Sequence, residues 1–152
     1  MVVRNAKLEE AASLTALCVR SKAHWGYDAA FMKLSAAALA VNEDDIAASR
    51  VLVAVDDAGR VIGMACVLPE GETSDLDALF VDPPAIGSGA GRALFDAAVI
   101  LARQQGARRM TILADPNSTD NTDLSVDDEA AMRRISALPI PQIALIRFIW
   151  YL

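Results

Sequence analysis

The chain is short of several residue types, and each shortage excludes a class of site or protein. Its 152 residues include two cysteines and one histidine, too few for a recognisable zinc site, so we predict no metal. Cys18 and Cys66 lie in apolar surroundings, where thiols serve as small core residues. No apolar run approaches the roughly 20 residues that span a bilayer, and the N-terminus lacks the apolar segment of a signal peptide. We therefore expect a cytoplasmic protein with no membrane partner.

Positive charge is also scarce. The formal net charge is −6 and the isoelectric point is about 4.7. This acidic balance argues against a broad contact with a phosphate backbone, so nucleic acid is not an expected partner.

Apolar residues are abundant, and their spacing predicts the fold. Hydrophobic residues make up 54% of the chain, enough for one domain spanning 1–152 with a core of its own. A hairpin signal at 56–59 favours antiparallel pairing, and strand–helix–strand over 73–115 implies a parallel crossover. We therefore predict an α/β fold in which helices flank a mixed central sheet. The predicted strands are 2–4, 50–55, 60–71, 73–81, 108–116 and 143–152, and the predicted helices are 8–20, 28–40, 44–50, 91–105 and 127–138.

The predicted strand 73–81 carries two acidic residues. Strict alternation places Asp75, Asp77 and Leu79 on one face. The opposite face then holds Leu76, Ala78 and Phe80.

The stretch VDPPAIGSGAGRALF, residues 81–95, joins that strand to the next predicted helix and alternates three glycines. A P-loop would need Lys and Ser or Thr after Gly91, where Arg92 and Ala93 stand, and a dinucleotide fingerprint would need glycine at 92. Two interpretations stay open. The successive N–H groups of the turn hold a pyrophosphate at a helix start, or glycine merely prevents a clash between strand and helix.

This stretch resembles the acetyl-CoA-binding motif of the GNAT superfamily of N-acetyltransferases. The resemblance is carried by Val81, Pro83, Gly89, Gly91 and Leu94, with the expected strand before and helix after. The order of elements over 2–116, about three-quarters of the chain, also follows the family. Where the family usually has Gln or Arg, this chain has Ile86.

The resemblance implies that acetyl-CoA is the co-substrate. Its pyrophosphate would lie on the amides of the glycine turn, and its pantetheine arm would pair with the preceding strand like an added strand. A backbone N–H of that strand would polarise the thioester carbonyl. The implied cofactor-binding residues are Leu79, Phe80, Val81, Gly87, Ser88, Gly89, Ala90, Gly91, Arg92 and Asn117.

The resemblance also implies transfer of acetyl to a primary amine by direct attack in a ternary complex. The amine must be neutral to attack, which requires a base. Asp75 stands where the family often places a carboxylate, and Asp77 is a second candidate; otherwise both are ordinary solvent-facing residues. His24, Trp25 and Tyr27 lie in the loop that closes over the acceptor in the family, or they form an aromatic plug between helices.

The family pattern breaks after Asn117, so 118–152 departs from it. A tyrosine that protonates the departing thiolate would fall at Thr122, Asp123 or Leu124. Its absence favours an alternative, a catalytically weak or inactive domain that binds or senses acyl-CoA. The apolar strand 143–152 would be a liability at a sheet edge, which suggests a homodimer formed through it.

Overall fold

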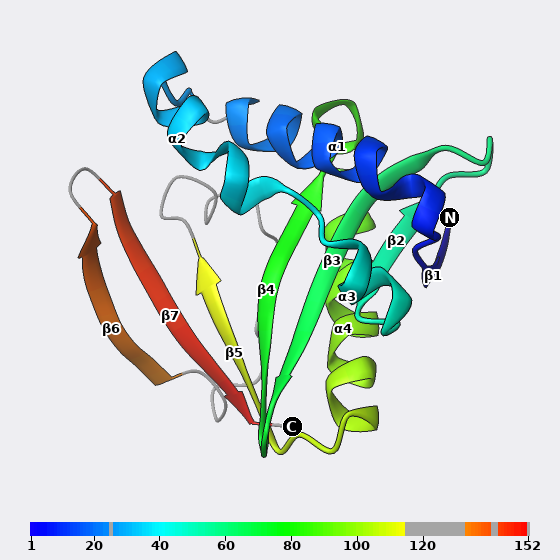
Figure 1. Cartoon of the computed structure of the whole chain (residues 1–152). Coiled ribbons are helices and arrows are strands. Elements are labelled where there is room, and N and C mark those ends of the chain that lie inside the picture. Colours follow the sequence, from blue (N-terminus) through cyan, green and yellow to red (C-terminus); the bar gives the residue numbers. More distant parts are fainter. Residues whose placement is uncertain (25, 115–132, 141–142, 152) are drawn as a thin grey trace.

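The central element of the computed structural model is a mixed sheet of seven strands (Figure 1), and the structure describes residues 1–24, 26–114, 133–140 and 143–151. The order across the sheet is β1-β2-β3-β4-β5-β7-β6. β4 and β5 pair in parallel, and the other neighbouring strands pair antiparallel. The strands are β1 (Val2–Asn5), β2 (Val51–Val55), β3 (Val61–Glu70), β4 (Thr73–Val81), β5 (Arg109–Ala114), β6 (Arg133–Ile140) and β7 (Ile143–Tyr151).

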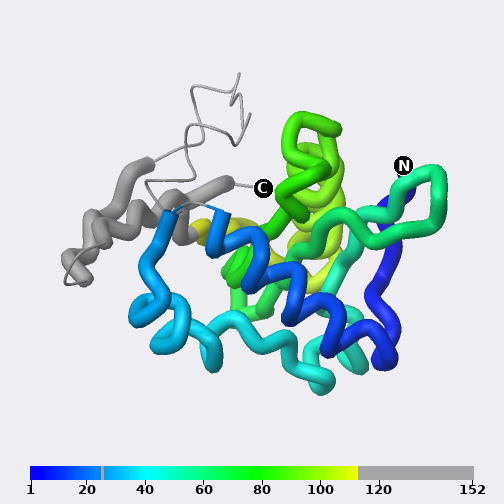
Figure 2. The backbone as a smooth tube through the Cα atoms, turned by 90° about the horizontal axis from the view of Figure 1, so that it is seen from above, coloured from blue at the N-terminus to red at the C-terminus, as the bar shows by residue number. Residues whose placement is uncertain are grey.

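Helices cover both faces of this sheet, as the view from above shows (Figure 2). α1, α2 and α3 lie on one face and α4 on the other (Figure 1), so the predicted α/β architecture is confirmed. Each face buries its own apolar cluster, one against α4 and one against α1. The helices are η1 (Leu8–Glu10), α1 (Ala11–His24), α2 (Ala29–Leu39), α3 (Glu43–Ala47), η2 (Pro83–Ala85) and α4 (Ala90–Gln104).

Side-chain caps fix where two of the helices begin. Asp28 accepts a hydrogen bond from the Phe31 N–H at 2.7 Å at the start of α2. Asn42 accepts one from the Asp44 N–H at 2.8 Å at the start of α3. Each cap satisfies an N–H that lacks a partner within its helix.

A β-bulge in β4 overturns the predicted division of its side chains between the two faces. The register with β3 passes from Cys66↔Ala78 to Val67↔Leu76, so Asp77 is an extra residue. Leu76 consequently joins the cluster beneath α4, whereas Ala78 packs with the cluster beneath α1. The prediction that Leu76, Ala78 and Phe80 share a face is wrong, because the bulge shifts the alternation by one residue.

The C-terminal part of the sheet corrects a second prediction. Residues 133–138, expected at the end of a helix over 127–138, belong to strand β6, while 127–132 lie outside the described residues. Pairing with β7 overrides the local helical pattern. The predicted strand 143–152 is confirmed as β7, but it lies between β5 and β6. The premise of the predicted homodimer, an exposed edge at this strand, is therefore wrong.

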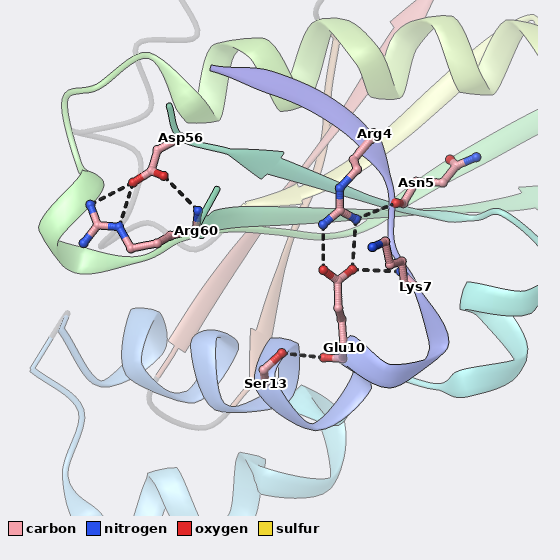
Figure 3. Close-up of polar contacts among 7 residues, drawn as sticks. All are labelled: Arg4, Asn5, Lys7, Glu10, Ser13, Asp56 and Arg60. Atoms are coloured by element: carbon pink, nitrogen blue, oxygen red, sulfur yellow. Dashed lines mark hydrogen bonds and ion pairs between the residues drawn. The ribbon is translucent and has the colours of Figure 1, made fainter. Parts of the chain in front are cut away.

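A partly buried ion pair joins β1 to η1 (Figure 3). The Arg4 guanidinium donates to both carboxylate oxygens of Glu10, at 3.0 and 2.6 Å, and the Lys7 N–H donates to Glu10 at 2.8 Å. The hydrogen bond from Arg4 lowers the pKa of Glu10 below its ordinary value. A similar pair, Asp56 with Arg60, closes the turn between β2 and β3.

The Glu10→Gln substitution is expected to lower the free energy of unfolding by about 0.5–1 kcal/mol at neutral pH, a modest loss because water screens the pair. The pKa of Glu10 is lower in the folded state. Its stabilisation is therefore complete above the unfolded pKa of about 4.3 and disappears as the pH falls through the folded value. Urea unfolding of wild type and variant should differ at neutral pH and converge in acid, with Glu9→Gln as control. A gap that persists undiminished in acid would contradict this assignment.

Candidate active site

The turn before α4, residues 87–92, holds several backbone donors without acceptors, and we call it the amide cradle. Ser88 donates its N–H to the Ala85 carbonyl at 3.1 Å, and the Ala90 N–H reaches the Ser88 hydroxyl at 3.3 Å. Among the described residues, the remaining N–H groups of the cradle have no hydrogen-bond acceptor: those of Gly87, Gly89, Gly91 and Arg92. Unpaired donors at the positive end of a helix dipole form a site suited to an anion.

Backbone conformation requires glycine at two positions of the cradle. Gly87 and Gly89 have φ of 86° and 87°, a left-handed conformation that favours glycine. A Cβ atom added at Gly87 would meet nothing within 4 Å, and one at Gly91 would meet only a Val81 methyl at 3.5 Å, an ordinary contact. The clash interpretation is therefore unsupported at Gly87 and Gly91.

The start of the turn is tied to α1. Arg20 of α1 donates to both carboxylate oxygens of Asp82, at 3.1 and 2.9 Å, immediately after β4 ends. Arg92 pairs with Asp96 at 3.1 Å along the exposed face of α4. The guanidinium of Arg92 is thus engaged along the helix, and its contribution to the cradle is its N–H.

The end of β4 offers a second row of backbone groups. The Asp82 N–H donates to the Ile62 carbonyl of β3 at 2.9 Å. Because successive amides of a strand point to opposite edges, Phe80 directs its N–H toward β3 as well. Leu79 and Val81 therefore direct their N–H groups toward the β5 side.

No strand of the described chain occupies that side of β4 beyond its bulge. The parallel pairing with β5 runs from Thr73↔Arg109 to Leu76↔Ile112 and ends there. The two strands then diverge toward the end of the sheet where the cradle lies (Figure 1). An extended chain could hydrogen-bond to this edge of β4 as an added strand.

Asp75 lies beside this opening, next to β5. Its Oδ1 accepts a hydrogen bond from the Thr111 hydroxyl at 2.6 Å, and the two residues are partners in the parallel register. Both side chains lie on the sheet face opposite α4, because their neighbours Leu76 and Met110 pack beneath that helix. Sequence reasoning missed Thr111. The sequence feature that could have indicated it is a polar side chain between the apolar residues Met110 and Ile112.

The carboxyl of Asp77, the bulge residue, has a pKa above its ordinary value. Loss of hydration raises the pKa of its carboxyl, and repulsion from Asp75 and Asp45 adds to that effect. Asp45, of α3, also pairs with Arg50 at 3.1 Å. Three carboxylates thus gather on one side of the sheet, and their charges favour a cationic ligand there.

Of the three predicted acceptor residues, the structure describes two. His24 is the last residue of α1, and Tyr27 stacks on Phe31 with ring centroids 4.5 Å apart. The Lys22 ammonium lies 4.6 Å from the centre of the Tyr27 ring. Tyr27 therefore packs within an aromatic cluster between α1 and α2. Trp25, like the predicted cofactor residue Asn117, lies outside the described residues.

Both cysteines are buried, and burial raises the pKa of each thiol to about 12. A thiol of that acidity is almost wholly protonated at neutral pH, and it is the thiolate that attacks acyl groups. Neither Cys18 nor Cys66 is therefore suited to carry an acyl group.

Iodoacetamide is accordingly expected to modify neither cysteine in the native protein at neutral pH, and both after unfolding, because the thiols are buried and protonated. Mass spectrometry of tryptic peptides measures the modification. Native Cys66 labelled as fast as a free thiol would contradict the assignment.

The described residues contain no group of three or more His, Cys, Asp or Glu side chains arranged to hold a metal ion. In the same part of the chain, no helix is long and apolar enough to cross a membrane.

A sheet that opens beside an amide cradle at a helix start can bind an elongated ligand that carries a phosphate group. The family model for the Acetyltransferase (GNAT) family matches residues 19–124, and the chain belongs to that family. A search of curated proteins found no match.

Solved structures show the same fold. The PaiA N-acetyltransferase of Thermoplasma acidophilum, in complex with coenzyme A, superposes with a TM-score of 0.74 at 14% identity over 96% of each chain. A GCN5-related N-acetyltransferase of Rhodopseudomonas palustris gives 0.72 at 24% identity, over 99% of this chain and 95% of that one. The ribosomal-protein-alanine N-acetyltransferase of Brucella melitensis gives 0.70 at 17% identity over 100% of both. At these identities the likeness concerns the fold.

Proposed function

We propose that this acetyltransferase moves an acetyl group from acetyl-CoA to a primary amine within a ternary complex. The observation that carries the proposal is the pair of adjacent backbone surfaces, the amide cradle and the unpaired edge of β4. Membership of the family and the coenzyme A bound to the Thermoplasma relative support it.

In this proposal the pyrophosphate of acetyl-CoA lies on the amide cradle. The pantetheine arm runs along β4, where Leu79 and Val81 offer their N–H groups. The Leu79 N–H donates to the thioester carbonyl oxygen and stabilises the negative charge that develops there during attack. Phe80 directs its N–H toward β3, so it donates no backbone hydrogen bond to the pantetheine arm.

The acceptor amine binds on the face opposite α4, beside Asp75. An alkylammonium with a pKa near ~10 must lose a proton before it can attack. Asp75 takes that proton directly or through one water, since a base must lie within hydrogen-bond reach of it. The amine lone pair then attacks the thioester carbon, the C–S bond breaks and coenzyme A leaves as the thiolate, while the new amide nitrogen gives up its second proton to water.

The thiolate is a tolerable leaving group. A thiol pKa near ~8.5 makes protonation of the leaving sulfur helpful and not obligatory. Water can supply that proton, so the lack of the family's tyrosine at 122–124, outside the described residues, lowers the rate without abolishing transfer.

The acceptor is a cationic amine, small or peptidic. The carboxylates of Asp45, Asp75 and Asp77 gather near one another on the acceptor side, where they attract a cation. The cytoplasmic location stays a prediction, as does the homodimer, although the position of β7 inside the sheet removes the reason given for it.

A second candidate function is binding or sensing of acyl-CoA without transfer. The observation that favours it is Thr122, Asp123 and Leu124 in place of the family's tyrosine. Incubation with acetyl-CoA and a panel of a polyamine, a lysine peptide and an N-terminal peptide separates the two. Transfer predicts acetylated amine and free CoA thiol in equal amounts. Saturable binding with neither product would favour the sensing domain.

A further inference from the structure

We propose that Thr111 is a positioning residue for acetyl transfer, acting through Asp75. The inference rests on the proposed function, in which Asp75 accepts the proton of the amine. Its basis is the 2.6 Å hydrogen bond from the Thr111 hydroxyl to Asp75 Oδ1.

The location of this pair explains why a fixed carboxylate is needed there. Asp75 and Thr111 are partners in the parallel register, and the pairing of β4 with β5 ends at the next pair, Leu76↔Ile112. Beyond that point no described strand pairs with the side of β4 that faces β5. The hydroxyl of Thr111 therefore fixes the carboxylate at the mouth of the opening, one pair before the backbone pairing ends.

The hydrogen bond also distinguishes the two carboxylate oxygens. Oδ1 is occupied by Thr111, and within the described part of the chain Oδ2 has no partner. Oδ2 is therefore the oxygen that accepts the proton of the amine. The hydrogen bond to Oδ1 holds the carboxylate in one orientation. Threonine suits this task because its branched side chain is restricted at χ1, so the donor is held with little rotational freedom.

The hydrogen bond from Thr111 also holds the Asp75 carboxylate against electrostatic repulsion. Burial is the main cause of the raised pKa of Asp77, and repulsion between the carboxylates of Asp75 and Asp77 adds to it. Without the bond from Thr111, this repulsion would turn the Asp75 carboxylate away from Asp77 and spread it over several rotamers. A base displaced by about an ångström loses much of its effect on the rate.

The test compares Thr111→Val, which keeps the shape and removes the donor, with Thr111→Ser, which keeps the donor. We expect the valine variant to lower kcat about 10-fold while the KM for acetyl-CoA stays within about twofold. The serine variant should recover most of the loss. Thr73→Val is the matched control, a half-buried threonine of β4 two residues before Asp75, and should transfer at the wild-type rate.

A double-mutant cycle separates positioning from a structural role. In the Asp75→Asn background, Thr111→Val should cause no further loss, because Thr111 acts only through that carboxylate. An additional 10-fold loss there, or a serine variant as slow as the valine one, would overturn the inference. Should the valine variant not fold, Thr111→Ala removes the same donor in its place.

Failure of this inference is distinguishable from failure of the proposed function. Wild-type kcat in Thr111→Val, with a slow Asp75→Asn, overturns the role of Thr111 alone. Wild-type kcat in Asp75→Asn overturns Asp75 as the base, and with it the route by which Thr111 acts. A wild-type protein that acetylates no amine overturns both.

Discussion

Replacing Gly89 by valine is expected to weaken acetyl-CoA binding at least about 100-fold. Gly89 caps α4 with a φ of 87°, and a β-branched residue strongly disfavours that conformation. Relief of the strain would rotate the peptide units on either side of residue 89. The N–H groups of Gly89 and Gly91 would then no longer point at one anion. Isothermal titration calorimetry with acetyl-CoA measures the loss.

The matched control for this substitution is Gly59→Val, in the turn between β2 and β3. Gly59 has a φ of 80°, and an added Cβ would meet nothing within 4 Å, so the backbone cost is comparable. Both variants should lose about 1–2 kcal/mol of stability, but Gly59→Val should bind acetyl-CoA like wild type. Equal affinity of the two variants would show that the cradle does not hold the cofactor.

Replacing Asp75 by asparagine is expected to lower kcat by a factor of about 10²–10⁴, the range over which a general base contributes. Asparagine keeps the size of the side chain and can still accept a hydrogen bond from Thr111, but it cannot take a proton from an ammonium. Acetyl-CoA affinity should be unchanged, because the cradle and the β4 edge are backbone surfaces. Steady-state release of CoA thiol, with saturating amine, measures the effect.

Two other carboxylates provide the comparison for Asp75→Asn. Asp77→Asn tests the second candidate base and should mainly raise the KM for a cationic amine. Asp96→Asn, on the exposed face of α4 away from the acceptor side, should leave kcat unchanged. A larger fall in kcat for Asp77→Asn than for Asp75→Asn would reassign the base to the bulge residue.

The features that follow from local chemistry could be predicted from the sequence. Glycines at 87 and 89 specify left-handed backbone before a helix, and Asn42 specifies a helix start, because each effect acts within a few residues. The hairpin and the parallel crossover also follow from turn residues and element order.

The features that depend on register could not be predicted. The bulge at Asp77 is visible only in the pairing of β3 with β4, and it moves Leu76 to the other face from Ala78. The contact of Thr111 with Asp75 requires knowing that these residues are partners across two parallel strands. Likewise, 133–138 resemble a helix locally, but pairing with β7 makes them a strand.

The central claim is that the amide cradle and the edge of β4 bind acetyl-CoA, and equilibrium unfolding with and without the cofactor tests it most directly. Acetyl-CoA at a hundred times its dissociation constant should raise the free energy of unfolding of the wild-type protein by ~2.7 kcal/mol. The Gly89→Val variant should gain almost nothing at the same concentration. Wild-type protein that gains no stability at any concentration of acetyl-CoA would contradict the account.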